Sequence, residues 1–215
     1  MDVPERLTAR VVAPGERPLL HGYDVQEDLS AHYGFGEVVL IALTGEAPSR
    51  EAGRAFDAAL TFASPVSVAE APSHAAALSR LCSAKPSSVA GVAAIGLAEQ
   101  ARHRLDELEA LLAWLREGRD GDAPTGVDDP GTARLHARLR AVGHPPDPRD
   151  AGLPLSAALV ATLFDLGLRE RWQLEAALAV ARWPIAIAEA MSNRPGDLRT
   201  YPIRLPEFAI TGDAE

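Results

Sequence analysis

Apolar positions repeat at three- and four-residue spacing through most of the chain, and proline, glycine and serine separate the repeats. The apolar run 35–43 is followed by Thr44 and Gly45, and glycine readily adopts the left-handed conformation that closes a helix. Ser49, with Glu51 behind it, predicts the N-cap of the next helix. Further helices are expected over residues 49–62, 74–83, 89–97, 98–116, 133–141, 155–166 and 170–191. This pattern predicts an all-α protein.

Local signals refine the pattern at several points. Gly22 predicts a tight turn, because glycine takes positive φ without steric cost. An alternating piece from Thr8 to Val12 could form an isolated strand. Ser73 is expected to cap the 74–83 helix. Pro184 is expected to kink or split the last helix, because proline lacks an amide donor.

A stretch rich in Gly, Asp and Pro, residues 117–134, interrupts the helical pattern. This composition is typical of surface loops. We expect a linker there, which is either a boundary between two lobes or the remnant of a deletion.

Composition and charge narrow the class of protein. The 215 residues carry a net charge of −9, which argues against a nucleic-acid partner, because phosphate backbones require a basic face. A local basic cluster at Arg194, Arg199 and Arg204 still allows a small anionic ligand. The single cysteine, Cys82, cannot form an internal disulfide. No apolar run reaches the roughly 20 residues of a membrane helix, and the N-terminus lacks the pattern of a signal peptide. A soluble cytoplasmic protein without a membrane partner is therefore expected.

Motifs for metal or phosphate binding are not recognisable in the sequence. The histidines lack the paired spacing of zinc ligands, so no metal is expected. His144 differs from the other histidines because Gly143 and Pro145 fix its backbone and present its ring at a turn. Arg149 could bind a carboxylate bidentately beside it. The alternative is a surface turn in which the His and the Arg are incidental.

The segment from His21 to Pro48 resembles the N-terminal signature of citrate synthases and citryl-CoA lyases. It shares the order of a Gly-Tyr turn, a short helix, Phe-x-Glu-Val, an apolar helix and Gly-Glu-x-Pro. Later segments resemble the same family in the same order, at 86–96, 143–149, 153–167 and 203–212.

The resemblance implies an all-α, citrate-synthase-like helical fold with a large domain and a truncated small domain. It assigns residues 1–117 to the large domain, 118–132 to a linker, 133–192 to the reduced small domain, and 193–215 to a tail that returns to the large domain.

The chemistry of this family forms or cleaves a carbon–carbon bond at a CoA thioester. An aspartate takes a proton from the methyl carbon, and two histidines polarise the thioester and ketone carbonyls. The resemblance assigns His144 as a catalytic histidine, with Arg149 and Arg204 as ligands of the substrate carboxylates. It places Glu99 where the first histidine is expected and Ser156 where the aspartate is expected. No cofactor is implied, and a CoA thioester is the possible substrate.

Three functions remain open at this point. The chain is an enzyme with altered catalytic groups, a catalytically reduced paralogue that acts as a partner or regulatory subunit, or a module that binds a small carboxylate or CoA. The family dimerises through helices of the large domain, so a homodimer or a heterodimer with a related subunit is expected. The apolar faces at 89–97 and 105–115 would suit that contact, and an ordinary intramolecular core is the alternative.

Overall fold

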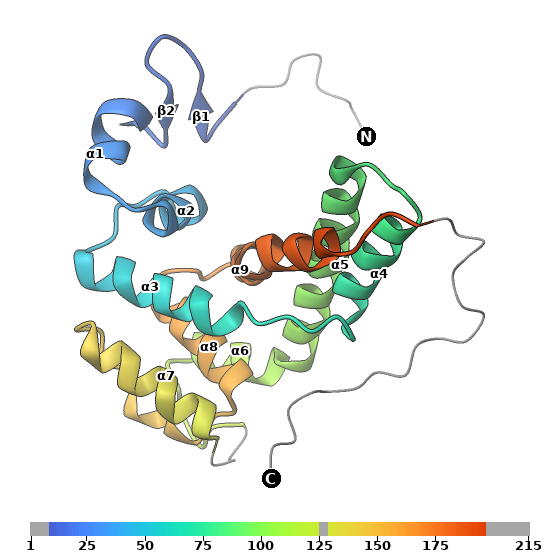
Figure 1. The fold of residues 1–215 in the computed structure, drawn as a ribbon. Coiled ribbons are helices and arrows are strands. Elements are labelled where there is room, and N and C mark those ends of the chain that lie inside the picture. The colour runs from blue at the N-terminus through green and yellow to red at the C-terminus, as the bar shows by residue number, and fades with distance from the viewer. Residues whose placement is uncertain (1–8, 125–128, 197–215) are drawn as a thin grey trace, which may run out of the picture. The chain divides into compact units, whose positions relative to one another are not determined.

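The computed structural model describes residues 9–124 and 129–196, which are almost entirely helical (Figure 1). The strands within them are β1 (Val12–Ala13), β2 (Leu19–Leu20) and β3 (Tyr23–Asp24). The helical elements are the π-helical η1 (Val25–Leu29), α1 (Ser30–His32), α2 (Phe35–Thr44), α3 (Arg50–Ala63), α4 (Ala71–Leu81), α5 (Pro86–Glu107), α6 (Glu109–Arg116), α7 (Pro130–Ala141), the 3-10 turn η2 (Pro148–Gly152), α8 (Leu155–Asp165) and α9 (Arg171–Ser192). The expected all-α class is confirmed.

The chain forms two compact units. The first draws its described residues from Met1–Phe62 and Leu108–Leu174, and the second from Ala63–Glu107 and Glu175–Glu215. One boundary between the units follows Glu107 at the end of α5, and another follows Leu174 within α9. Both lie outside the linker expected at 118–132. The division into a large and a reduced small domain stays a prediction.

The first unit begins with a small antiparallel sheet. Gly22, at φ +88°, makes the predicted turn that leads into β3. The expected strand was placed too early and was not isolated: β1 pairs with β2, and β2 pairs with β3. The isolated strand was wrong because Pro14-Gly15 starts a hairpin rather than ending the extended segment.

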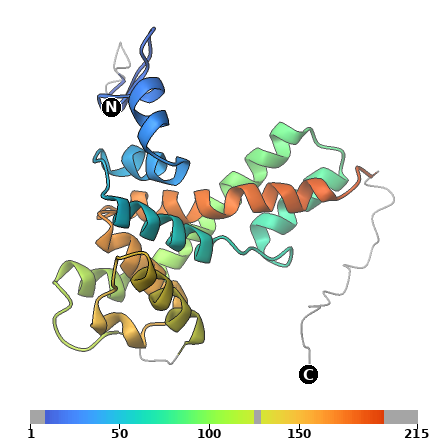
Figure 2. The ribbon, with the colours of Figure 1, turned by 60° about the vertical axis from the view of Figure 1, so that its left-hand side comes forward.

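Two predicted helix ends in the first unit are confirmed. Gly45 closes α2 at φ +81°, and its amide donates to the carbonyl of Ile41 at 2.7 Å. The side chain of Ser49 accepts a hydrogen bond from the amide of Ala52 at 3.2 Å, as an N-cap does. At the start of α2, the Glu37 carboxylate accepts from the Gly34 amide at 2.7 Å. Farther along the chain, α7 and α8 pack side by side (Figure 2).

In the second unit, α4, α5 and the later part of α9 surround one apolar core. Its buried members are Ala76, Val89, Ala93, Leu97, Ala186 and Ala190. Gly96 permits close packing of α5 on α4, because a Cβ there would lie 3.0 Å from the Cα of Pro72. Small side chains therefore set the distance between these two helices.

The structure corrects three helix predictions in this region. A single helix, α5, replaces the separate helices expected at 89–97 and 98–116, and the break falls at Leu108. Buried residues recur every four positions from Val89 to Leu105, so one face stays on the core throughout. Ser73 does not cap α4: Glu70 occupies the N-cap position, without a side-chain cap bond, and Ser73 is fully buried. Pro184 lies inside α9, so it does not split the helix, and the alternative of a kink stays a prediction.

Candidate functional site

The turn that contains His144 is built by the end of α7. Gly143 adopts φ +85°, and its amide donates to the carbonyl of Arg140 at 3.1 Å. The amide of His144 reaches back to the carbonyl of Leu139 at 3.0 Å. This pair of bonds is a Schellman cap, which requires glycine at this position and explains the Gly-His pair structurally. The His144 side chain is half-buried, and it has no hydrogen bond to any residue in the described ranges.

Arg149 lies in η2, five residues after His144, and its guanidinium is fully engaged. It donates to the Asp147 carboxylate at 2.9 and 2.6 Å. It also donates to the carbonyls of Gly118 and Arg119 at 3.0 and 3.3 Å. The resemblance assigns the positive charge of Arg149 to a substrate carboxylate, but here Asp147 neutralises that charge.

Arg119 is the centre of this region, although the sequence placed it in a surface linker. Arg119 is only 8% exposed, and its backbone φ is +64°. The guanidinium donates to Asp150 at 2.9 and 3.0 Å, and to Asp165 at 3.1 and 2.6 Å. It lies 5.7 Å from the centre of the Trp114 ring. The expectation of a solvated linker is therefore wrong at Arg119, which ties the 118–121 loop to η2 and to the end of α8.

Both guanidinium groups of this Arg119 cluster are paired with carboxylates. Burial lowers the pKa of Arg119, but its hydrogen bonds to Asp150 and Asp165 outweigh that effect and raise the pKa above its ordinary value. Burial raises the pKa of Asp150, and Arg119 partly offsets the rise. The hydrogen bond from Arg149 holds the pKa of Asp147 well below its ordinary range. Three carboxylates thus face two guanidinium groups, and no positive charge is left over for a ligand.

Glu99 belongs to the second unit and lies on the solvent side of α5. Its side chain is 65% exposed. Arg102, one turn farther along the helix, donates to its carboxylate at 2.9 and 3.2 Å. A second acid, Asp106, pairs with the same arginine at 3.4 Å. Glu99 is therefore a member of an exposed ion-pair row.

Ser156 is the second residue of α8 and is exposed. The nearest acid on the same helix is Asp165, nine residues later, at the end of the helix. Nine residues correspond to two and a half turns, which places the two side chains on opposite faces, about 13 Å apart along the axis. Asp165 cannot stand in for an acid at the Ser156 position.

The residues of the expected site are divided between the two units. His144, Arg149 and Ser156 belong to the first unit, and Glu99 belongs to the second. Arg204 lies outside the described residues. Within the described ranges, no group of three or more His, Cys, Asp or Glu side chains could hold a metal ion. No described helix is long and apolar enough to cross a membrane.

His136 is a second residue that the sequence did not single out. It is buried in α7 at 6% exposure, and its Nε2 atom has no hydrogen-bond partner among the described residues. Burial lowers its pKa, so the imidazole is neutral at pH 7. Helical spacing on the apolar face of α7, between Leu135 and Leu139, is the signal that indicates its burial.

The comparisons identify the fold as citrate-synthase-like, which confirms the resemblance at that level. Citryl-CoA lyase from Hydrogenobacter thermophilus superposes with a TM-score of 0.67 at 16% identity, over 97% of this chain and 96% of that one. No protein-family profile and no curated protein matches the sequence. This likeness establishes the fold, so the chemistry must be argued from the residues.

Two ATP citrate lyases share the same fold over a smaller part of their length. The enzyme from Methanosaeta concilii, solved with (3S)-citryl-CoA, has a TM-score of 0.58 at 13% identity, over 89% of this chain and 39% of that one. The enzyme from Methanothrix soehngenii, solved with citrate and coenzyme A, has a TM-score of 0.59 at 13% identity, over 96% and 43%.

Proposed function

We propose that this chain uses the citryl-CoA lyase fold as a scaffold, as a dimerising partner or regulatory subunit, and not for carbon–carbon bond chemistry of its own. One observation carries this proposal: the two positions that the resemblance assigns to catalytic groups hold Glu99 and Ser156, both exposed. The proposal fits the fold and explains why the helical framework is retained while the reactive side chains differ.

Glu99 cannot replace a histidine that polarises a thioester carbonyl. That task requires a hydrogen-bond donor, and a carboxylate donates only when it is protonated. Two nitrogens of Arg102 donate to one carboxylate oxygen of Glu99, Oε2, so the group acts as an acceptor there. An acceptor therefore stands at the position where the resemblance expects a donor to the developing oxyanion.

Ser156 cannot replace the aspartate as a carbon base. A serine hydroxyl becomes basic only when a neighbouring base activates it. The one acid on the same helix, Asp165, lies on the opposite face and is bound to Arg119. Losing catalytic groups that act together costs several orders of magnitude in rate.

The substrate loop is also committed to internal contacts. Arg149 is bound by Asp147 and by two backbone carbonyls. A carboxylate ligand would have to displace Asp147, and it would add a further negative charge to a cluster that already holds three carboxylates against two guanidinium groups. The loop is suited to holding η2 in place, which is a structural use of residues that the family uses for binding.

Only part of the first of the two segments considered for a dimer contact is exposed. Val89, Ala93 and Leu97 are buried in the core of the second unit, as the intramolecular alternative required, and most apolar side chains of 105–115 are buried as well. Ile95, in the 89–97 segment, is 70% exposed, and Trp183 on α9 is 41% exposed. Contact with a second copy, or with a related subunit, would cover such side chains.

An enzyme with altered groups is the second candidate, and His144 is the observation that favours it. Its imidazole is free of internal hydrogen bonds in the described structure and could donate to a ketone or a carboxylate. A CoA thioester or a citrate-like acid would be the ligand in that case.

Turnover and mass together separate the two candidates. The purified chain is assayed for CoA release from acetyl-CoA with oxaloacetate and for cleavage of citryl-CoA, and its mass is measured by light scattering. The scaffold proposal expects no turnover above the buffer blank and a dimer that Ile95→Arg converts to a monomer. Turnover that disappears in His144→Ala would overturn it in favour of the enzyme, and a monomeric wild-type chain would overturn the homodimer.

A further inference from the structure

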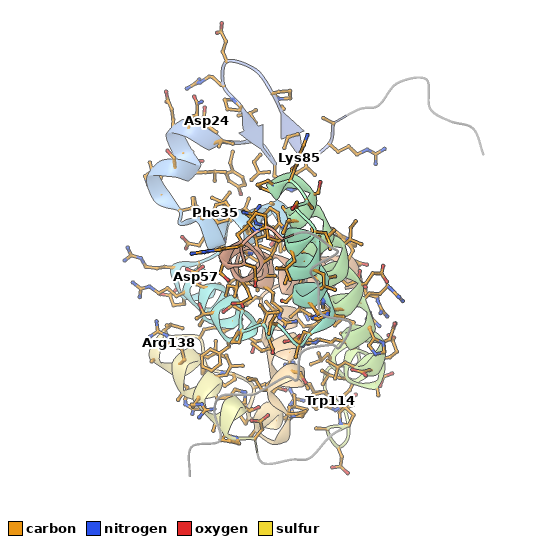
Figure 3. All side chains as sticks on the ribbon, turned by 45° about the vertical axis from the view of Figure 1, so that its right-hand side comes forward. Asp24, Phe35, Asp57, Lys85, Trp114 and Arg138 are labelled. Atoms are coloured by element: carbon orange, nitrogen blue, oxygen red, sulfur yellow. The ribbon has the colours of Figure 1, made fainter. Side chains whose placement is uncertain are left out.

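A pocket lies in the first unit, between α3 and α7. Its volume is about 350 Å³. Residues of α3 form most of the wall, and Arg138 of α7 completes the lining. Figure 3 labels Asp57 and Arg138 on these two helices. The lining consists of Arg54, Asp57, Ala58, Thr61, Phe62 and Arg138. None of the residues assigned to the citrate-synthase-like site lies in this wall.

The two arginines of this pocket, Arg54 and Arg138, form no ion pair and no side-chain hydrogen bond with any residue in the described ranges. The charge of Arg54 nevertheless interacts with Glu51 on the same helix. Arg138 also lies on a helix without acids, since α7 (Pro130–Ala141) contains three arginines and no Asp or Glu. In a chain with a net charge of −9, this is a local concentration of positive charge facing a cavity.

Asp57 gives the pocket its chemical selectivity. Its carboxylate lines the same wall as the arginines. It is held close to α2, since a Cβ added to Gly36 would collide with its Oδ1 atom at 1.8 Å. Burial and the nearby Glu37 raise the pKa of Asp57. Its carboxylate oxygens can accept a hydrogen bond from a ligand. A ligand that fits two guanidinium groups and one carboxylate must accept at two points and donate at a third.

We propose that the pocket between α3 and α7 binds the phosphoryl group of a small phosphomonoester. The phosphoryl oxygens accept from Arg54 and Arg138, and the remaining P–OH donates to Asp57. Because the second pKa of a phosphomonoester is about 6, only a minor fraction keeps this proton at pH 7, and this monoanion is the form that pairs with Asp57. Sulfate has no protonated form near neutral pH. Guanidinium groups suit such oxyanions because they present paired donors.

The size of the pocket indicates an ester and not only the free ion. A volume of about 350 Å³ is at the lower end of small-molecule sites and exceeds what inorganic phosphate needs. Ala58 and Phe62 supply an apolar wall for the organic part. A phosphomonoester with an aromatic group should therefore bind more tightly than inorganic phosphate.

Calorimetric titration of the full chain at pH 7 and constant ionic strength tests the proposal. The probes are phenyl phosphate, inorganic phosphate and sulfate. Phenyl phosphate should bind most tightly, and sulfate most weakly. Arg54→Gln and Arg138→Gln should each weaken phosphate binding by about tenfold, as loss of a charged hydrogen bond predicts. Arg134→Gln and Arg140→Gln are the controls on the same helix, and each should change affinity by less than about twofold.

The Asp57→Asn variant distinguishes a selective site from a general positive surface. An amide can donate to an ion that has no proton, so this variant should bind sulfate about as well as phosphate. Far-UV circular dichroism verifies that each variant is folded. The proposal is overturned by absence of phosphate and phenyl phosphate binding at millimolar concentration, by equal losses in the control variants, or by sulfate binding that Asp57→Asn leaves unchanged.

Discussion

The Arg119 cluster allows a quantitative test of what holds the first unit together. In Arg119→Met, the apolar part of the side chain remains beside Trp114, but the guanidinium that serves Asp150 and Asp165 is lost. The side chain of Asp150 is 3% exposed, so it would become a buried carboxylate without a cation. Asp165, at 27%, can regain water and contributes less to the loss.

Breaking a buried ion pair by removing one partner costs about 3–5 kcal/mol of stability. For a chain of this size, that corresponds to a fall in Tm of roughly 6–20 °C. The loss comes mainly from the stranded Asp150 charge, so Arg119→Met with Asp150→Asn should be more stable than Arg119→Met alone. Arg102→Met, which removes an arginine from an exposed ion pair, serves as the matched control and should leave Tm unchanged within error.

The pH dependence has a definite sign. Without Arg119, burial raises the pKa of Asp150 further above its unfolded value of about 3.9. Between these two values the native state binds more protons than the unfolded state, so stability falls as pH rises through them. The deficit of Arg119→Met relative to wild type is therefore largest at pH 7 and shrinks toward pH 4. Thermal melts followed by circular dichroism measure this difference. A deficit under about 1 kcal/mol at pH 7, or no recovery in the double variant, would refute the reasoning.

Further predictions concern the second unit and can be tested by the same melts. Arg182 is 4% exposed and donates to Glu70 at 2.6 Å and to the carbonyl of Pro65 at 2.9 Å. Arg182→Met should therefore lower the free energy of unfolding by about 2–3 kcal/mol. An unchanged Tm would contradict this expectation. Gly96→Ala should destabilise by about 1–3 kcal/mol, because its Cβ would press on Pro72. Gly91→Ala, on the same helix but in open space, should stabilise by about 0.5–1 kcal/mol, and the opposite order of the two would count against the packing described for α4 and α5.

The sequence was most informative where a backbone conformation demands a particular residue. Gly22 and Gly45 need positive φ, and Ser49 satisfies an amide at a helix start, so their roles follow from local chemistry. The continuity of α5 was missed because no local signal distinguishes its two halves, and only the shared core shows that they form one helix.

The candidate site was harder to predict, because its key contacts join residues that are distant in sequence. Arg119 lies among glycines and aspartates that are typical of a solvated loop, and its partners follow 31 and 46 residues later. An ion pair between residues so distant in sequence produces no periodic pattern along the chain. The positions of Glu99 and Ser156 were obtained from the resemblance alone, and the structure adds what their side chains contact.

The most direct measurement of the central claim follows the proton on the methyl carbon of acetyl-CoA. The purified chain is incubated with acetyl-CoA and oxaloacetate in D₂O, and deuterium in the acetyl group of acetyl-CoA and in any citrate formed is measured by mass spectrometry. This reads proton abstraction directly, whether or not a carbon–carbon bond forms afterwards. With Ser156 in place of a carbon base, we expect exchange at the rate of the protein-free blank. Exchange well above that rate, and abolished by His144→Ala, would show that this chain performs the chemistry of its fold.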